Sequence, residues 1–218
     1  MDKKIDTLAL NKKTWDKIAK KYEEHRPKWP EKDCPLFKYF LSNLQTGSLI
    51  LDIGSGTGLP YAKKLIENGF KVLGIDISPT MVKIAKKNVP QGQFKQLSMT
   101  DLDYENKFEG VISSFSMLLL DPEQFNDVAK RIVRALKKGG FFYLSLNEPE
   151  EENIDVDNYD YTIIEIMGQK MYSRPYTEKE VLTIFSSLGM KLMKLYRKMQ
   201  TSELYGTEFT INFIFKKE

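Results

Sequence analysis

The sequence has little cysteine and little histidine. Its 218 residues include one of each, Cys34 and His25. A single cysteine cannot form a disulfide within the chain, which suits a reducing compartment, so we expect a cytoplasmic protein. One cysteine and one histidine are also too few for a zinc site, and we expect no metal.

Long hydrophobic runs and a concentration of one charge are absent too. Residues 1–10 lack the apolar core of a signal peptide, and no run approaches the length of a membrane span. The net charge is only +3, and basic pairs such as Lys63-Lys64 and Lys86-Lys87 fall on expected helices. Solvated helix faces explain these pairs better than a nucleic-acid groove, so we expect no nucleic-acid or membrane partner.

A hydrophobic strand that leads into a glycine-rich loop is the most informative part of the chain. Residues 49–58 read LILDIGSGTG. The apolar run is typical of a strand buried on both faces of a parallel sheet. Glycines let the backbone approach a ligand closely, and the helix that follows offers unpaired N–H groups. Strand, loop and helix together predict a nucleotide-type site at the carboxyl edge of a sheet.

Strands and helices alternate through most of the chain, which predicts an α/β fold of the doubly wound, Rossmann-like type with helices on both faces of the sheet. Gly139-Gly140 is expected to end a helix and begin a strand. The expected helices are 7–24, 35–44, 57–67, 79–88 and 122–137, and the expected strands are 48–53, 71–76, 93–97, 110–115 and 140–146.

The pattern changes after residue 147. Residues 148–160 are acidic, without Lys or Arg, and are expected to form an exposed loop. Two strands at 161–166 and 169–174 should turn at Gly168. Thr177 and Glu180 form a capping box that opens a helix ending near Gly189. Strands at 191–199 and 207–215 predict an antiparallel hairpin at one edge of the sheet.

The spacing of the glycines distinguishes between two kinds of cofactor. The dinucleotide pattern G-x-G-x-x-G would place a glycine where Leu59 stands. The chain has D-x-G-x-G-x-G from Asp52 to Gly58, and here it resembles the class I S-adenosylmethionine-dependent methyltransferases. The resemblance implies a seven-stranded sheet, mostly parallel with an antiparallel C-terminal strand. It also implies a single methyltransferase domain over 1–218, with 1–44 as an N-terminal helical cap and 148–176 as an insertion forming a lid on the acceptor side.

Two further acids support the resemblance. Asp76 follows the second expected strand, 20 residues after Gly56, where a carboxylate can accept hydrogen bonds from both ribose hydroxyls. The alternative is that Asp76 caps the next helix, with Ser78 as its rival for that role. In the resembled family an acid after the third strand holds the adenine amino group, and Asp101 matches that position. Its alternative role, shared with Thr100, is to cap a short helix.

The resemblance assigns the cofactor to one set of residues. An A-x-x-Y element in the first helix, Ala19 to Tyr22, matches a helix that folds over the cofactor in many small methyltransferases. The alternative is that the apolar face of this helix, formed by Trp15, Ile18, Ala19 and Tyr22, is part of the core. The fourth strand should face the methionine part of the cofactor. The expected cofactor-binding residues are Tyr22, Asp52, Gly54, Ser55, Gly56, Gly58, Asp76, Ile77, Met81, Met99, Thr100, Asp101, Ser114 and Phe115.

The acceptor is less defined by the sequence. Many small-molecule members of the family carry a histidine after the fourth strand, where this chain has leucines at 118–120. Methyl transfer from a sulfonium is an in-line displacement that depends mostly on alignment, so a missing base does not rule it out. No catalytic residue is assigned, and Tyr22 and His25 are the candidates for that role. Tyr22, His25 and Tyr172 are candidates for the acceptor shell, and the insertion adds tyrosines 159, 161 and 176.

The leading hypothesis is therefore an S-adenosylmethionine-dependent methyltransferase that acts on a small-molecule acceptor. A dinucleotide-dependent oxidoreductase is the first alternative, although the third glycine and a proton-relay residue are missing. A module that binds S-adenosylmethionine without turnover is the second alternative. The sequence does not name the acceptor, the atom methylated or the oligomeric state.

Overall fold

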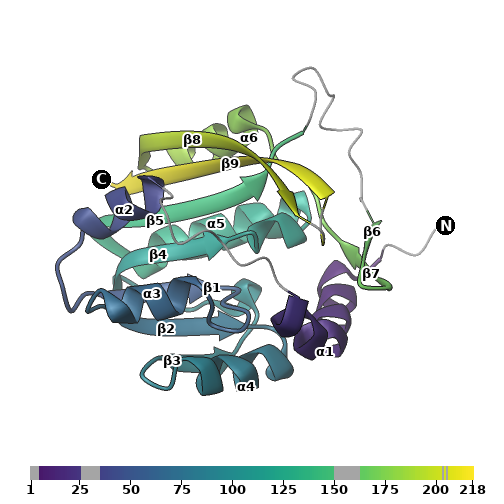
Figure 1. Ribbon diagram of the computed structural model, residues 1–218. Coiled ribbons are helices and arrows are strands. Elements are labelled where there is room, and N and C mark those ends of the chain that lie inside the picture. Colours follow the sequence, from purple (N-terminus) through teal and green to yellow (C-terminus); the bar gives the residue numbers. More distant parts are fainter. Residues whose placement is uncertain (1–4, 26–34, 150–162, 203, 205) are drawn as a thin grey trace.

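A seven-stranded sheet forms the centre of the computed structural model, which describes residues 5–25, 35–149, 163–202, 204 and 206–218 (Figure 1). The strand order is β3-β2-β1-β4-β5-β9-β8, and β9 runs antiparallel to both of its neighbours. The predicted sheet, with its antiparallel C-terminal strand, is confirmed. The strands are β1 (Leu49–Ile53), β2 (Lys71–Asp76), β3 (Gln93–Gln96), β4 (Phe108–Ser114), β5 (Leu136–Asn147), β8 (Met190–Ser202) and β9 (Gly206–Lys217).

Helices cover both faces of this sheet because successive side chains of the central strands point to opposite sides and both sets are apolar. In β1, Leu51 and Ile53 join one buried cluster, and Ile50 joins the other. The first cluster contains α5 (Pro122–Ala135) and α6 (Glu178–Ser187), and the second contains α2 (Pro35–Ser42), α3 (Tyr61–Glu67) and α4 (Pro79–Asn88).

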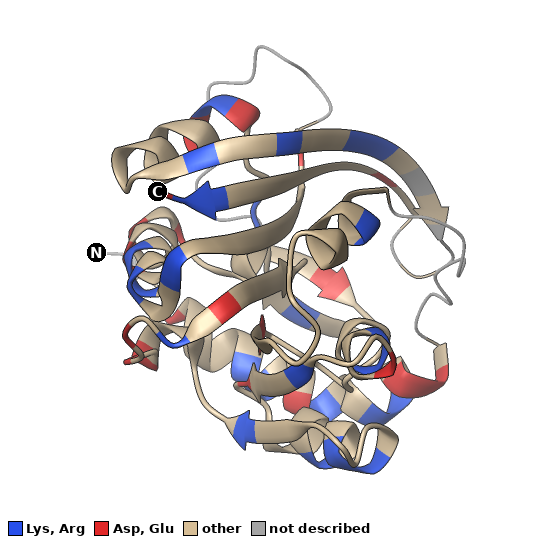
Figure 2. Cartoon of the chain, turned by 90° about the vertical axis from the view of Figure 1, so that its left-hand side faces the viewer, with Lys and Arg blue, Asp and Glu red and all other residues tan. Residues whose placement is uncertain are grey.

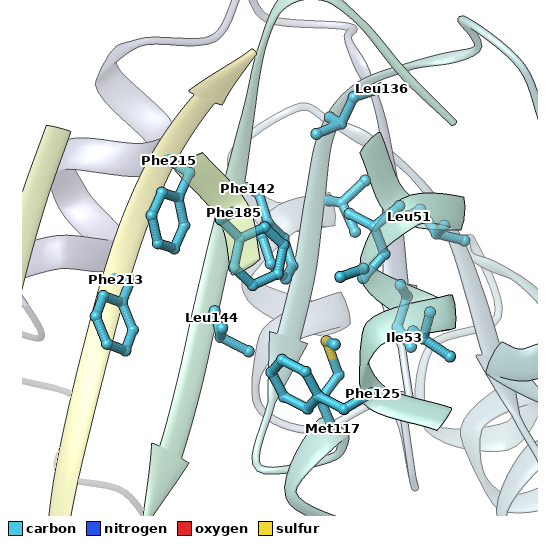
Figure 3. Close-up of a cluster of buried hydrophobic side chains, with 14 of the residues drawn as sticks. Leu51, Ile53, Met117, Phe125, Leu136, Phe142, Leu144, Phe185, Phe213 and Phe215 are labelled. Atoms are coloured by element: carbon cyan, nitrogen blue, oxygen red, sulfur yellow. The ribbon is translucent and has the colours of Figure 1, made fainter. Parts of the chain in front are cut away.

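The first cluster is rich in aromatic rings on the side of the sheet where β5, β9 and β8 lie. Phe213 and Phe215 of β9 lie beside Phe142 of β5 and Phe185 of α6 (Figure 3). The Phe185 and Phe215 rings stack with centroids 4.9 Å apart. The terminal strand is thus bound to the sheet by its side chains as well as by its backbone.

Two elements lie beyond the carboxyl ends of the central strands. The first is α1 (Thr7–His25), which packs against α4 and β7. The second is an antiparallel pair formed by β6 (Ile163–Ile166) and β7 (Gln169–Tyr172), which turns at Gly168 as predicted. Figure 1 shows both at the same end of the molecule. They enclose the space in which a ligand of a doubly wound sheet would sit.

The element boundaries follow the sequence closely, with two exceptions. The helix expected at 57–67 begins only at Tyr61, because the chain turns through residues 57–60 before α3. The capping box predicted at Thr177 and Glu180 is present. The prediction that Gly139-Gly140 ends a helix is wrong, because α5 ends at Ala135 and β5 already begins at Leu136. The pairing register of β4 with β5 shifts next to these glycines, and Gly139 has a φ of +78°. The two glycines therefore form a bulge, where one residue needs a positive φ.

Charged residues are spread over the surface in this structure. Lysines and arginines occur on most helices and outer strands, with acidic residues between them (Figure 2). Across the residues that the structure describes, no helix combines the length and hydrophobicity that a membrane crossing requires.

Candidate cofactor and acceptor site

A cavity of about 530 Å³ opens at the carboxyl ends of β1, β2 and β4. This volume lies within the range of small-molecule sites, roughly 300–1,000 Å³. One end is formed by the glycine loop after β1 and by the acid at the end of β2. The other end lies between α1, β6, β7 and the ends of β5, β8 and β9. One continuous space thus joins the predicted cofactor site to a second chamber.

The three glycines of the loop have different roles. A Cβ on Gly54 would lie 2.3 Å from the Ser116 Cβ, so this glycine permits close packing of the loop on β4. A Cβ on Gly58 would lie 3.1 Å from Val89, and Gly58 does not line the cavity. Gly56 lines the cavity with a φ of +52°, and a Cβ there would meet no atom within 4 Å. Of the three glycines, only Gly56 therefore leaves open space beside its backbone for a ligand.

The carboxyl of Asp76 is held against the glycine loop. The backbone N–H groups of Gly56 and Ser78 each donate to it at 2.9 Å. Burial raises its pKa to about 6 although both hydrogen bonds oppose that rise. Ser78 is the N-cap of α4, since its hydroxyl accepts from the Met81 N–H at 3.1 Å. The rival cap is thus confirmed, and Asp76 remains at the cavity wall.

Asp52, at the end of β1, is a buried acid without a hydrogen-bonding partner for its side chain among the described residues. It is 4 % exposed and lines the cavity. Burial, and then the neighbouring Asp76, raise its pKa to about 7. The hydroxyls of Ser55 and Thr57 are buried without a partner in the same part of the chain. A folded loop with three such groups is suited to a ligand that brings hydrogen-bond donors.

Only some of the adenine contacts predicted in the segment after β3 line the cavity. It forms the short helix η1 (Met99–Asp101), which Ser98 caps by accepting from the Thr100 N–H at 3.3 Å. Ser98 and Met99 line the cavity, whereas Thr100 and Asp101 do not, and Asp101 is exposed. The cap role considered for Thr100 and Asp101 belongs instead to Ser98. An adenine contact from Asp101 stays a prediction.

Most of the predicted cofactor residues are brought together by the fold. One of them, Phe115, follows β4 in a strained backbone conformation with a φ of +53°. Three predicted residues, Gly58, Thr100 and Asp101, do not line the cavity. The ones that line it are Tyr22, Asp52, Gly54, Ser55, Gly56, Asp76, Ile77, Met81, Met99, Ser114 and Phe115.

Helix α1 forms one wall of the cavity and is attached on both sides. Asp16 accepts from the Ser78 hydroxyl at 2.9 Å and from the Thr80 N–H at 3.0 Å, which fixes α1 to the first turn of α4. The Asn11 side chain pairs with both backbone groups of Tyr172 in β7, donating at 3.0 Å and accepting at 2.8 Å. The helix is therefore a bridge between the cofactor end and the second chamber.

The second chamber is largely apolar. Leu8 and Trp15 of α1 face it, together with Ile164 of β6 and Met171 of β7. Leu118 and Leu119, in the short helix η2 (Met117–Leu119), complete this wall. Polar lining residues come from the far ends of strands and from one loop, namely Asn147, Ser173, Lys198, Thr201 and Glu208.

Two of the three acceptor-shell candidates lie elsewhere. His25 is exposed, its ring Nδ1 lies 2.9 Å from the Lys21 carbonyl, and it does not line the cavity. Tyr172 is fully buried and does not line the cavity either. Tyr176 is in the core, where it donates to the Leu120 carbonyl at 2.9 Å. Tyr22 alone of these lines the cavity, and residues 159 and 161 lie outside the described residues.

Asn11 and Asn147 line the cavity without having been predicted for any role, and Trp15 lines it after being predicted only as part of the apolar face of the first helix. Asn11 shares that face with Trp15, so the helical period could have extended the prediction to it. Asn147 is the last residue of β5, so the rule that ligands meet the carboxyl ends of strands was its only signal.

The fold and the site define a class of protein that binds a nucleotide-type ligand at the carboxyl edge of a doubly wound sheet. Residues 50–140 match a family model described as a methyltransferase domain. Residues 50–140 therefore form a domain of the class I S-adenosylmethionine-dependent methyltransferase family.

Curated relatives match a little under half of the chain. An uncharacterized methyltransferase of Synechocystis is 34% identical over 104 residues, which is 46% of this chain and 48% of the relative. A demethylmenaquinone methyltransferase of Chlorobaculum tepidum is 33% identical over 99 residues, which is 44% of this chain and 39% of the relative. The chain spans about half the length of the curated relatives it matches.

Solved structures share the fold over most of the chain. A methyltransferase from Methanosarcina mazei has a TM-score of 0.73 at 19% identity, covering 85% of this chain and 98% of that one. The magnesium protoporphyrin IX methyltransferase of Synechocystis, solved with bound S-adenosylmethionine, has a TM-score of 0.72 at 13% identity and covers 100% of both chains.

Proposed function

We propose that the protein transfers the methyl group of S-adenosylmethionine to a small-molecule acceptor by in-line displacement. The observation that carries this proposal is the join within one cavity. The glycine loop and two buried acids form one end, and an apolar chamber under α1 forms the other. A transfer between two bound molecules requires such a shared space, because the reacting atoms must be aligned in contact.

The residues of the first end fit the cofactor. The space above Gly56 is open, so a ligand can lie against its backbone. Asp76 would accept from ribose hydroxyls, and Met99 would lie beside the adenine ring. The buried carboxyl of Asp52 and the hydroxyl of Ser55 would meet polar groups of the ligand. When bound, the cofactor supplies a methyl carbon activated by its sulfonium.

The remaining work of the chain is alignment and exclusion of water. Trp15 and the leucines of η2 supply an apolar wall, which favours an acceptor held close and dry. The single histidine of the sequence, His25, is not at the cavity. We therefore propose acceptors that are already nucleophilic as free species, such as thiolates, neutral amines or phenolates.

The N-terminal cap and the insertion after β5 would together form the acceptor side. Of the proposed cap, 1–44, helix α1 lines the cavity. Of the proposed insertion, 148–176, the cavity is lined by Ile164, Met171 and Ser173. These contacts support a lid made from both segments. The central part of the insertion, 150–162, lies outside the described residues.

Titration calorimetry with S-adenosylhomocysteine tests the cofactor, with NADH measured alongside. Micromolar binding of S-adenosylhomocysteine alone is expected. Gly56→Val should reduce that affinity by about 100-fold or more, because the new side chain fills the space above the loop. Gly139→Val is the matched control, since Gly139 also has a positive φ and open space but lies in the β5 bulge. Equal affinity in wild type and Gly56→Val would overturn the cofactor assignment.

Turnover distinguishes an enzyme from a module that only binds. Protein loaded with methyl-labelled S-adenosylmethionine should label at least one member of a panel of thiols, amines and phenols. Binding of S-adenosylhomocysteine together with no labelling across the panel would favour the binding module. Binding of NADH alone would favour the dinucleotide alternative.

A further inference from the structure

We propose that Asn147 determines the acceptor, and that the acceptor is an uncharged aromatic molecule which donates an N–H or O–H hydrogen bond to the Asn147 side-chain oxygen. This inference rests on the proposed methyl transfer. The donor group is distinct from the atom that is methylated, because an amide oxygen is too weak a base to remove a proton from a nucleophile.

The structure holds Asn147 firmly at the cavity. It ends β5 and is paired with Thr210 of β9. Its carbonyl accepts from the Tyr176 N–H at 2.9 Å. Both backbone neighbours belong to the core of the fold, since Thr210 and Tyr176 are buried. The side chain therefore starts from a rigid base, which is what a selective contact needs.

The orientation of the Asn147 amide follows from its neighbour. Its Nδ2 donates to Glu208 Oε1 at 2.9 Å. A carboxylate can only accept, so the nitrogen must face Glu208 and the oxygen must face away from it. That oxygen, Oδ1, is buried and has no donor among the described residues. A buried acceptor without a donor is costly, and a bound molecule with an N–H or O–H would remove this cost.

The apolar wall of the same chamber limits the rest of the acceptor. Trp15 and Leu119 pack with Ile164 and Met171, and all four line the cavity. Large aromatic and sulfur-containing side chains favour an aromatic ligand. The indole N–H of Trp15 is also buried without an acceptor in the part of the chain described. A phenol, or an N-heterocycle that has a second ring nitrogen as acceptor beside its N–H, carries both kinds of hydrogen-bonding group that this chamber leaves open, and a simpler N–H heterocycle carries the donor for Oδ1.

Charge at this end of the cavity is balanced. Lys198 and Glu208 are the charged residues from the strand ends that line it, and they have opposite signs. A ligand with a net charge would have to leave water for the apolar wall without a matching excess of opposite charge. This balance favours a neutral acceptor, so of the nucleophiles proposed above it selects the neutral amines over the thiolates and phenolates.

The test uses matched probes on the full chain with saturating S-adenosylhomocysteine. The pairs are 1-naphthol with 1-methoxynaphthalene, and indole with 1-methylindole. In each pair the member with the free O–H or N–H is expected to bind about tenfold tighter or more, because the methylated member leaves Oδ1 unpaired. The difference should disappear in Asn147→Leu.

Ser145→Ala is the matched control. Ser145 lies two residues earlier in β5 and does not line the cavity. Its hydroxyl donates to the side-chain oxygen of Asn212 in β9, at a distance of 2.6 Å. This variant also loses a hydrogen bond between β5 and β9 side chains, and it should keep the probe preference. Equal binding within both pairs, no binding by any probe, persistence of the preference in Asn147→Leu, or its loss in Ser145→Ala would overturn the proposal.

A second variant guards against misfolding of Asn147→Leu. Glu208→Gln removes the carboxylate that fixes the amide, so the amide can turn and the probe preference should fall. An unchanged preference in Glu208→Gln would overturn the proposal. The affinity for S-adenosylhomocysteine is measured first and without probes. Its absence in the wild type would overturn the proposed function, whereas its presence with no probe preference would overturn only this inference.

Discussion

Replacing the buried acid at the end of β1 should make the ligand-free protein more stable at neutral and alkaline pH. Asp52 is 4 % exposed, and its side chain has no hydrogen-bonding partner among the described residues. Its pKa is raised from 3.8 to about 7. Asp52→Asn keeps the shape of the side chain and removes the ionisable group, so the variant does not have to bury this charge.

The magnitude follows from the two pKa values. A difference between 3.8 and about 7 corresponds to roughly 4 kcal/mol in the free energy of unfolding. Between these pH values the native protein keeps a proton that the unfolded chain has lost. The native state therefore binds more protons, and stability falls as the pH rises from about 4 to about 7. Between pH 5 and pH 8 the loss from Asp52 is about 2.5 kcal/mol.

Urea unfolding of wild type and Asp52→Asn at pH 5 and pH 8 measures this effect. Other acids, including Asp76, titrate in both proteins, so the comparison is between the two losses on going from pH 5 to pH 8. The loss should be about 2.5 kcal/mol smaller in the variant. If both proteins lose the same free energy over this interval, Asp52 is not a buried charge in the native state and the reasoning is refuted.

The remaining predictions concern the attachment of α1 and the stability of α6. Asp16→Ala removes the acceptor of the Thr80 N–H and should weaken S-adenosylhomocysteine binding, by about tenfold in calorimetry, because α1 lines the cavity; undiminished affinity would mean that α1 stays in place without this contact. The pKa of Asp16 is lowered by its hydrogen bonds with Thr80 and Ser78, so its contribution to the stability of the fold is present at neutral pH and is lost as the pH falls through that pKa. Thr177→Ala removes the α6 cap and should lower the free energy of unfolding by about 1 kcal/mol while calorimetry shows an unchanged affinity; a change in affinity would show that α6 is coupled to the site.

The parts of the site that the sequence predicted are those that depend on short stretches of chain. The loop from Asp52 to Gly58 and the acid at Asp76 follow buried strands directly, and parallel strands bring their carboxyl ends to the same edge. The family prediction made from this loop is confirmed. The bulge at Gly139-Gly140 was missed because a glycine pair has the same local signature at a helix end and in a strand.

The acceptor end depends on contacts between distant segments, and local patterns do not contain those. Asn147 is oriented by Glu208, which is 61 residues away in the chain. Asn11 binds Tyr172 across 161 residues. Tyrosines such as Tyr172 and Tyr176 suggested a ligand chamber from composition, but the fold buries both side chains, and the Tyr176 ring stacks on Phe125 of α5.

The position of β9 within the sheet has a consequence for how the chain folds. In the described residues β8 is joined to the sheet through β9, although β8 precedes β9 in the sequence. A ribosome therefore releases β8 before the strand that docks it, and the edge of β5 with which β9 pairs stays unpaired until then. The nascent domain should be prone to aggregation until β9 emerges, and chaperones would find their binding surface at β5 during that interval.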